Sequence, residues 1–366
     1  MNGAQDQVAI IGGGFAGTAL AVLLRATLPA DARVLLFEPA PRAGPGLAYG
    51  TADPSHVLNV PAGGMSLHPD RPGHFAEWLA SRPDAPAAPP EGGPVFAERV
   101  LYGTYLEEQL AAAMAAPGAA LRLLRQRVED ITRLPGGGFR LLAGGGQHDV
   151  ARVLLAPGGF ASAPGQPPHL AGNPWDPATL EGIDPAATVL LVGMGLTMVD
   201  MLLSLRRRGH QGRVVAISRH GWLPAAHVAG PFPPPWPVEA PRGAGPASWC
   251  RVLRREAARA AAAGQPWQAV MDGARAQVQR VWQGWSMAQR ATFLRHGRTA
   301  WNLHRHRLAP SIAGRLAGEC ASGGLETLAA RLESWQPEAD GTVTALLRPR
   351  HGAPRRLAVA RIVLCT

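Results

Sequence analysis

The sequence predicts an α/β fold made of two similar halves, each a doubly wound parallel sheet, and three observations carry this prediction. A glycine-rich turn follows a short apolar run twice, at residues 12–17 and at residues 193–198. Each turn opens a helix-like stretch, and another apolar run comes after it. Both halves end in a similar strand, at residues 150–158 and 359–366. Strands that alternate with helices in this way indicate parallel β-α-β units.

The first half begins with a strand at residues 8–11, whose run Val-Ala-Ile-Ile is of the kind buried in parallel sheets. Residues 12–17 then read Gly-Gly-Gly-Phe-Ala-Gly, which matches G-x-G-x-x-G. A helix is expected over residues 18–28 and a second strand over residues 33–37, which ends at Glu38. This order of strand, glycines, helix, strand and acid is typical of a Rossmann-like dinucleotide site.

The residues of this motif have separate physical roles. Gly12 permits a tight turn, Gly14 lets the backbone approach a pyrophosphate, and Gly17 allows the helix to pack closely on the strand. The helix N-terminus offers free N–H groups and a positive dipole to the phosphates. Glu38, which lies 26 residues after Gly12, is placed to accept hydrogen bonds from a ribose diol. The first half therefore predicts a site for FAD or NAD.

The second half repeats this pattern but departs from it at the third glycine position. Apolar residues 188–192 lead into Gly-Met-Gly-Leu-Thr-Met-Val-Asp at residues 193–200, and the next strand is expected at residues 213–217. Met198 stands where the first half has its third glycine. We therefore expect a helix that is held slightly off the strand.

The end of that next strand decides the type of dinucleotide. Gly193 and Arg219 are 26 residues apart, the same separation as in the first half. Ser218, Arg219 and His220 stand there in place of the acid, which suits a ribose 2′-phosphate. The second half therefore predicts an NADP site, with NADPH preferred over NADH. The alternative is that Arg219 is a solvated strand end.

The repeat extends to the end of each half. Residues 121–142 and 331–347 both predict strands of a small β-meander with a glycine-containing turn. We therefore expect a FAD-binding domain at residues 1–165 and an NAD(P)-binding domain at residues 183–366.

A helical insertion is expected within the second domain, at about residues 223–315. Its first part, residues 223–247, is rich in proline and reads as an extended connector. In the Ala- and Arg-rich part that follows, Arg298, Asn302 and Arg305 would share one helix face. This face could hold an anionic substrate or the NADP phosphates, or it could be an ordinary solvated basic face.

The positive charge is concentrated in the second half. Lys+Arg is 36, all of it arginine, against 26 Asp+Glu, and residues 166–366 hold 24 of the arginines and 12 of the acids. Such a basic half suggests a polyanionic partner. The alternative is that arginine stands where other proteins use lysine. No nucleic-acid-binding motif accompanies the arginines, so a phosphate-bearing cofactor is expected rather than a nucleic acid.

Cysteine usage and hydropathy exclude several other classes. Cys250, Cys320 and Cys365 lie far apart, which argues against a disulfide framework and a zinc site, and we expect no bound metal. The N-terminus lacks the basic stretch of a signal peptide. The longest apolar run, residues 188–205, is interrupted by two glycines and Asp200. We therefore expect a cytoplasmic protein that does not enter a membrane, and we leave its oligomeric state open.

Several segments together carry a family resemblance. They are the Gly-Leu-Ala-Tyr-Gly-Thr run at residues 46–51, the loop at residues 56–66, the second glycine motif at residues 193–200, and His-Arg-His-Arg-Leu-Ala-Pro at residues 304–310. With these motifs the sequence resembles the bacterial FAD/NAD(P)-binding proteins related to flavin-dependent urate hydroxylases and amino-acid N-monooxygenases. The resemblance implies that the loops at residues 46–49 and 59–66 line the flavin.

The sequence departs from this family at its end. Family members continue past the last strand with a glycine and a further segment that returns to the flavin domain. The sequence here stops at Cys365-Thr366, on the apolar strand itself. We therefore expect a fragment that lacks part of the flavin wall.

Together, motifs and resemblance predict a FAD-dependent, NAD(P)H-consuming oxidoreductase, a monooxygenase that uses molecular oxygen to hydroxylate a small polar substrate. The alternatives are an NADPH-dependent flavin reductase or dehydrogenase, and a non-catalytic dinucleotide-binding redox module. No residue is compelled to act as a catalytic acid or base. The expected cofactor-binding residues are Gly12, Gly13, Gly14, Phe15, Ala16, Gly17, Glu38, Pro39, Leu47, Ala48, Tyr49, Asn59, Met65, Ser66, Val128, Ala156, Pro157 and Gly158 for FAD, and Gly193, Gly195, Leu196, Thr197, Asp200, Ser218, Arg219 and His220 for NADP.

Overall fold

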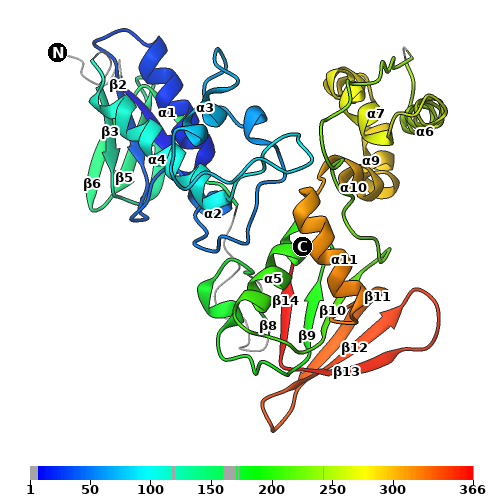
Figure 1. Ribbon diagram of the computed structural model, residues 1–366. Coiled ribbons are helices and arrows are strands. Elements are labelled where there is room, and N and C mark those ends of the chain that lie inside the picture. The colour runs from blue at the N-terminus through cyan, green and yellow to red at the C-terminus, as the bar shows by residue number, and fades with distance from the viewer. Residues whose placement is uncertain (1–6, 118–119, 160–169, 172, 242, 366) are drawn as a thin grey trace. The chain divides into compact units, whose positions relative to one another are not determined.

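The computed structural model describes residues 7–117, 120–159, 170–171, 173–241 and 243–365. The chain divides into two compact units (Figure 1). The first comprises Met1–Pro86 and Ala97–Ser162, and the second comprises Ala87–Phe96 and Ala163–Thr366. A short segment of the first half of the sequence therefore packs with the second unit.

The first unit is built on a parallel sheet of order β3-β2-β1-β7, with the antiparallel sheet β4-β5-β6 beside it. Its elements are β1 (Gln7–Ile11), α1 (Phe15–Thr27), β2 (Arg33–Phe37), α2 (Gly46–Tyr49), η1 (Ala62–Gly64), α3 (His74–Ala80), α4 (Arg99–Ala115), β3 (Ala120–Leu124), β4 (Val128–Arg133), β5 (Phe139–Ala143), β6 (Gly146–Val150) and β7 (Arg152–Leu155).

Strand β2 shows why this sheet is covered on both faces. Side chains of successive strand residues point to opposite faces. Val34 and Leu36 pack in a cluster with residues of α1 and α4, whereas Leu35 and Phe37 pack against the antiparallel sheet. The unbroken apolar run of the sequence is thus buried from both sides, as expected for a parallel strand.

The second unit has a seven-stranded sheet of order β13-β12-β11-β10-β9-β14-β8. Its elements are β8 (Leu170–Ala171), η2 (Pro177–Leu180), β9 (Val189–Val192), α5 (Leu196–Arg207), β10 (Val214–Ser218), α6 (Pro246–Ala262), α7 (Trp267–Ala274), η3 (Arg275–Gln277), α8 (Val278–Gln283), α9 (Met287–His296), α10 (Arg298–Arg305), α11 (Pro310–Ala321), β11 (Leu325–Pro337), β12 (Val343–Pro349), β13 (Arg355–Val359) and β14 (Arg361–Leu364). Figure 1 shows α5 and α11 on one face of this sheet.

The two units repeat one topology, which confirms the predicted fold class. The order β3-β2-β1-β7 of the first unit matches β11-β10-β9-β14 of the second. Strand β11 pairs in parallel with β10 through its first half and antiparallel with β12 through its second half. In the first unit the same two pairings are divided between β3 and β4. The expectation that residues 121–124 belong to a meander was therefore wrong, because they continue the parallel sheet.

Helices α6 to α10 form a bundle within the second unit. Its core contains Trp249, Val252, Val270 and Trp285, with Trp282 and Phe293 packed against it. Only some of the tryptophans of this arginine-rich region are thus fully buried. Within the part of the chain that the structure describes, no helix is long and apolar enough to cross a membrane. The same residues contain no cluster of three or more His, Cys, Asp or Glu side chains that could hold a metal ion.

Candidate functional site

In the first unit, the turn between β1 and α1 can accept only glycine at its first position. Gly12 has φ +103°, and a Cβ added there would lie 2.1 Å from the carbonyl oxygen of Ala156. The backbone that follows β7 therefore lies directly against this turn. The structure brings together two predicted segments, the glycine turn and Ala156-Pro157, as the sequence motif requires.

The last glycine of the motif sets the distance between helix and strand. A Cβ on Gly17 would lie 1.8 Å from the carbonyl oxygen of Gly12, so any side chain would push α1 away from β1. Helix α1 begins after Gly14, and no side chain caps its N-terminus. Its first N–H groups are therefore left for a ligand, as the dinucleotide interpretation requires.

Glu38 lies beside the same turn, immediately after β2. One carboxylate oxygen accepts a hydrogen bond from the N–H of Gly13 at 2.8 Å, and the other accepts one from the N–H of Ala40 at 2.8 Å. A Cβ on Gly13 would lie 2.7 Å from Cβ of Glu38. The carboxylate is therefore fixed at the turn, and each oxygen retains a lone pair for a ribose hydroxyl.

The loop that follows β2 also returns to the glycine turn. A Cβ on Gly46 would lie 2.9 Å from Cα of Gly14, and the ring of Tyr49 lies 6.1 Å from that of Phe15. Leu47 and Ala48 of the same short helix are exposed. The predicted flavin loop at residues 46–49 thus lies beside the phosphate-binding turn.

Helix α4 contributes residues that sequence reasoning missed. The Tyr102 ring packs edge-on against Tyr49 at 4.7 Å, and a Cβ on Gly103 would lie 2.5 Å from the carbonyl oxygen of Tyr49. Burial is the main cause that raises the pKa of both tyrosines. The available signal was Gly103 itself, because a glycine inside a stretch of helix-forming residues is unfavourable without a packing reason.

The other predicted flavin residues lie in varied surroundings. The Ser66 hydroxyl bonds within its own loop, to the carbonyl oxygens of His68 and Arg71. Val128 packs against the core between the two sheets of the first unit. Asn59 and Met65 are half-buried, while Pro39 and Gly158 are exposed. Their assignment to FAD stays a prediction.

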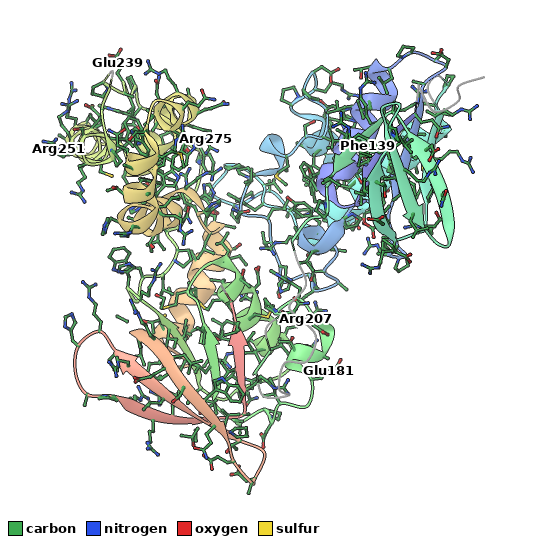
Figure 2. All side chains as sticks on the ribbon, turned by 180° about the vertical axis from the view of Figure 1, so that it is seen from behind. Phe139, Glu181, Arg207, Glu239, Arg251 and Arg275 are labelled. Atoms are coloured by element: carbon green, nitrogen blue, oxygen red, sulfur yellow. The ribbon has the colours of Figure 1, made fainter. Side chains whose placement is uncertain are left out.

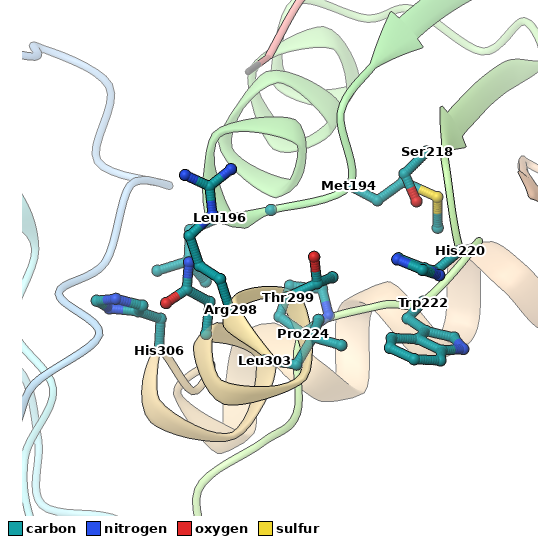
Figure 3. A pocket seen from close by; sticks show the side chains of 12 residues that line it. Met194, Leu196, Ser218, His220, Trp222, Pro224, Arg298, Thr299, Leu303 and His306 are labelled. Atoms are coloured by element: carbon teal, nitrogen blue, oxygen red, sulfur yellow. The ribbon is translucent and has the colours of Figure 1, made fainter. Parts of the chain in front are cut away.

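In the second unit, the equivalent turn opens onto a cavity of about 450 Å³. Gly193 has φ +114°, and Gly195 is the N-cap of α5 with no side-chain cap. No atom lies within 4 Å of a Cβ added to Gly195. The side chains that line this dinucleotide cavity (Figure 3) are those of Met194, Leu196, Ser218, His220, Trp222, Pro224, Arg298, Thr299, Asn302, Leu303 and His306.

The polar side chains of the dinucleotide cavity come from two directions. Arg298, Thr299 and Asn302 belong to α10, and Figure 3 shows Arg298 beside the start of α5. His220 stacks on Trp222 with ring centroids 4.6 Å apart, and its Nδ1 is buried without a hydrogen-bond partner among the described residues. His220 therefore lines the cavity with its ring, while its Nδ1 atom is itself buried.

The electrostatics of the dinucleotide cavity favour an anion. Arg298 carries a full positive charge, while burial and then Arg305 lower the pKa of His306, which is therefore neutral at pH 7. Among the described residues, no Asp or Glu side chain lines this cavity. With the open N-terminus of α5, these groups can hold a phosphate or pyrophosphate, and a nicotinamide dinucleotide fits the cavity chemically.

Of the three predicted NADP residues at the end of β10, two line the dinucleotide cavity and one does not. Ser218 and His220 line the dinucleotide cavity, whereas Arg219 between them is exposed and does not. The chain bends directly after β10, where the Ser218 hydroxyl accepts a hydrogen bond from the N–H of Gly221 at 3.0 Å. Arg305 likewise does not line the cavity, although Arg298 and Asn302 of the predicted helix face do. The assignment of Arg219 to the 2′-phosphate stays a prediction.

The remaining predicted residues lie along α5. Met198 is fully buried at the third glycine position, and Asp200 is buried one turn after the helix start. Burial, followed by the charge of Asp200, raises the pKa of the Cys365 thiol to about 12. Thr197 is half-buried and does not line the cavity. Thr197, Met198 and Asp200 thus belong to the start of α5 but do not line the dinucleotide cavity.

Comparison with known proteins agrees with this geometry. Residues 9–160 match the model of a family described as FAD-NAD(P)-binding, which confirms the family resemblance for the first half of the sequence. No curated protein sequence matches the chain.

Solved structures share the fold across nearly the whole chain. Among them is the ornithine N-hydroxylase of Kutzneria sp. 744, at 14% identity over 99% of this chain and 80% of that one, with a TM-score of 0.62. A cadaverine monooxygenase from Erwinia amylovora matches at 14% identity over 99% and 77% of the two chains, with a TM-score of 0.60. The ornithine hydroxylase of Pseudomonas aeruginosa matches at 14% identity over 99% and 81%, with a TM-score of 0.59.

Proposed function

We propose that this protein is a FAD-dependent oxidoreductase that consumes NADPH and hydroxylates a small polar substrate, as a monooxygenase. The first unit would hold FAD and the second NADPH. The observation that carries the proposal is the repetition of one sheet order in two units, each with a glycine turn whose helix N-terminus is open. Two such sites in one chain suit a flavin and its reductant.

The residues of the first unit fit the pyrophosphate and ribose of FAD. The backbone N–H groups at the start of α1 would face the pyrophosphate, because Gly14 leaves that helix end uncapped. Glu38 is already oriented by Gly13 and Ala40, so it would accept the ribose hydroxyl groups with little loss of side-chain entropy. These groups bind and orient the cofactor.

The residues of the second unit fit a nicotinamide dinucleotide. The start of α5 and Arg298 would hold its phosphates, and the ring of His220 would lie beside the ligand. The Trp222 indole, stacked on His220, offers a flat apolar surface for a ring of the ligand. Arg219 is assigned to the 2′-phosphate.

The reaction we propose is balanced with these cofactors. NADPH and a proton supply two electrons and two protons in all, one atom of molecular oxygen enters the substrate, and the other leaves as water. Bound FAD supplies the redox chemistry between NADPH and oxygen. Amines are the first substrates to test, because the structural neighbours named above are ornithine and cadaverine hydroxylases.

The test begins with the purified protein mixed with FAD. A bound yellow chromophore that NADPH bleaches without air, and that recovers when oxygen is admitted, is the expected result. With an amine substrate, isotopically labelled oxygen should appear in the product. Protein that never binds FAD would refute the flavoenzyme. Bleaching without any label in a product across amines, purines and small acids would favour the reductase instead.

A further inference from the structure

The helical bundle of the second unit contains a second cavity, of about 250 Å³, between α6, α7, α9 and α10. We refer to it as the bundle cavity. Its apolar walls are formed by Leu253, Trp267, Val270, Met271, Phe293 and Trp301. It shares no lining residue with the dinucleotide cavity. The proposed reaction therefore gives it no role.

Helix α10 stands between the two cavities and presents a different face to each. Arg298, Thr299 and Asn302 line the dinucleotide cavity, while Ala300 and Trp301 line the bundle cavity. Residues at these spacings lie on opposite faces of a helix. The apolar face of α10 is thus directed at a hollow space.

The walls of the bundle cavity are rigidly packed aromatic rings. The Trp267 ring meets His304 edge-on at 4.9 Å, and Phe293 meets Trp301 edge-on at 6.4 Å. A Cβ on Gly297 would lie 2.7 Å from the Phe293 ring, so glycine is needed there for α10 to start beside it. Phe293 also packs on the bundle core. Walls anchored in this way cannot easily collapse into the space.

Arg254 brings a positive charge to the rim of the bundle cavity. His296 and His304 also line it, and among the described residues no Asp or Glu does. Arg254 makes no ion pair or hydrogen bond with any other residue that the structure describes, in contrast to Arg255 and Arg259, which both pair with Glu256. A guanidinium without a carboxylate partner at the mouth of an apolar cavity complements an anionic head group.

From the aromatic walls and the unpaired Arg254 we propose that the bundle cavity binds a small aromatic carboxylic acid. The ring would lie among Trp267, Phe293 and Trp301, and the carboxylate would meet Arg254 at the rim. The volume equals that of roughly eight liquid water molecules, which suits one aromatic ring with a short side chain. Edge-on and offset contacts between aromatic rings provide the orientation.

The test measures binding of three probes with the same ring and different heads: phenylacetate, phenylethanol and phenylethylamine. Calorimetry on the full chain, with its bound flavin if any, gives the dissociation constants. For a ligand of about ten non-hydrogen atoms we expect a Kd of about 1 mM for phenylacetate. The alcohol should bind about threefold more weakly, and the amine should bind more weakly still. Equal affinity for the acid and the amine would overturn the proposal.

Variants locate the site. Arg254→Gln should weaken phenylacetate binding about threefold and leave phenylethanol unchanged. Arg251→Gln is the matched control, because Arg251 is exposed on the same helix and does not line the cavity (Figure 2). Ala257→Leu should abolish binding of both probes, because the larger side chain fills the cavity. A melting temperature close to that of the unsubstituted protein is the control that this variant is folded.

Competition separates this proposal from the proposed function. Saturating NADPH should not displace phenylacetate, because the two cavities have no lining residue in common. Displacement by NADPH, or unchanged binding in Arg254→Gln, would overturn the bundle site. Both results stand whether or not the protein proves to be a flavoenzyme.

Discussion

The carboxylate of Glu38 accepts a hydrogen bond from the backbone N–H of Gly13 at 2.8 Å, which ties the end of β2 to the glycine turn after β1. The acid therefore has a structural role in the turn as well as the predicted role toward a ribose. Because a Cβ on Gly13 would clash with the Glu38 side chain, the two residues depend on each other. This relationship gives the first prediction.

Replacement of Glu38 should weaken FAD binding and also loosen the turn. Glu38→Ala removes the acceptor of two backbone N–H groups, and we expect a loss of about 1 to 2 kcal/mol in the free energy of unfolding. FAD affinity should fall at least about tenfold. Urea unfolding and flavin titration measure the two effects. Glu129→Ala, at an exposed position on β4, should change neither.

Substitution of two arginines should show which of them binds the 2′-phosphate and which binds the pyrophosphate of the nicotinamide dinucleotide. If Arg219 binds the 2′-phosphate, Arg219→Gln raises KM for NADPH about tenfold and leaves KM for NADH unchanged. Arg298 faces the start of α5, so Arg298→Gln should raise both KM values together. Steady-state rates with each dinucleotide decide this.

The control for these two variants lies on α10 itself. Arg305→Gln, exposed and outside the dinucleotide cavity, should leave both KM values unchanged. If Arg298→Gln loses the preference for NADPH and Arg219→Gln keeps it, Arg298 and not Arg219 binds the 2′-phosphate.

A buried histidine at the base of the second sheet predicts a pH dependence of stability. His210 Nε2 donates to the carbonyl oxygen of Ala187 at 2.9 Å, and Nδ1 accepts from Arg206 at 3.0 Å, so the ring is neutral. Burial is the main cause that lowers the pKa of His210, and Arg206 adds to the effect. The unfolded chain, with a histidine pKa of about 6.5, then binds a proton that the folded state does not.

The sign follows from this difference. The contribution of His210 to stability is complete above about pH 6.5 and is lost as the pH falls through that value toward the lower pKa of the folded state. His210→Asn should therefore reduce the decline in the free energy of unfolding between about pH 7 and pH 5. The exposed His351→Asn should leave the slope as it is. An unchanged slope in His210→Asn would contradict the prediction.

Near the end of α10, one carboxylate pairs with two arginines that differ strongly in burial. Arg307 and Arg275 both pair with Asp272, but their side chains are 3% and 69% exposed. Arg307 also lies over the ring of Trp267 at 6.0 Å. We expect Arg307→Met to lower the free energy of unfolding by about 2 kcal/mol, and Arg275→Gln by less than about 0.5 kcal/mol.

Denaturant unfolding of the two variants compares them directly. Because Arg307 lies two residues after the end of α10, Arg307→Met should also weaken NADPH binding, whereas Arg275→Gln should not. Equal destabilisation by both substitutions would show that burial does not decide the strength of this pair.

Much of the first site could be predicted from local patterns. Glycines at positions 12, 14 and 17 predict a turn. The structure gives the reason for Gly12 and Gly17, because neighbouring backbone atoms leave no room for a Cβ at either position. The strand expected at residues 33–37 is β2 without change. Sequence analysis failed at residues 121–124, because the pairing partner of a strand depends on segments that are distant in the sequence.

The sequence by itself determined the two glycine turns, the strands that lead into them and the acid that follows β2, because turn geometry and strand burial are set by neighbouring residues. Only the tertiary structure decided which cations face the second turn. Packing of the helical bundle carries Arg298 to the start of α5, although 102 residues separate it from Leu196. The bend of the chain after β10 likewise leaves Ser218 and His220, and not Arg219, among the residues that line this cavity.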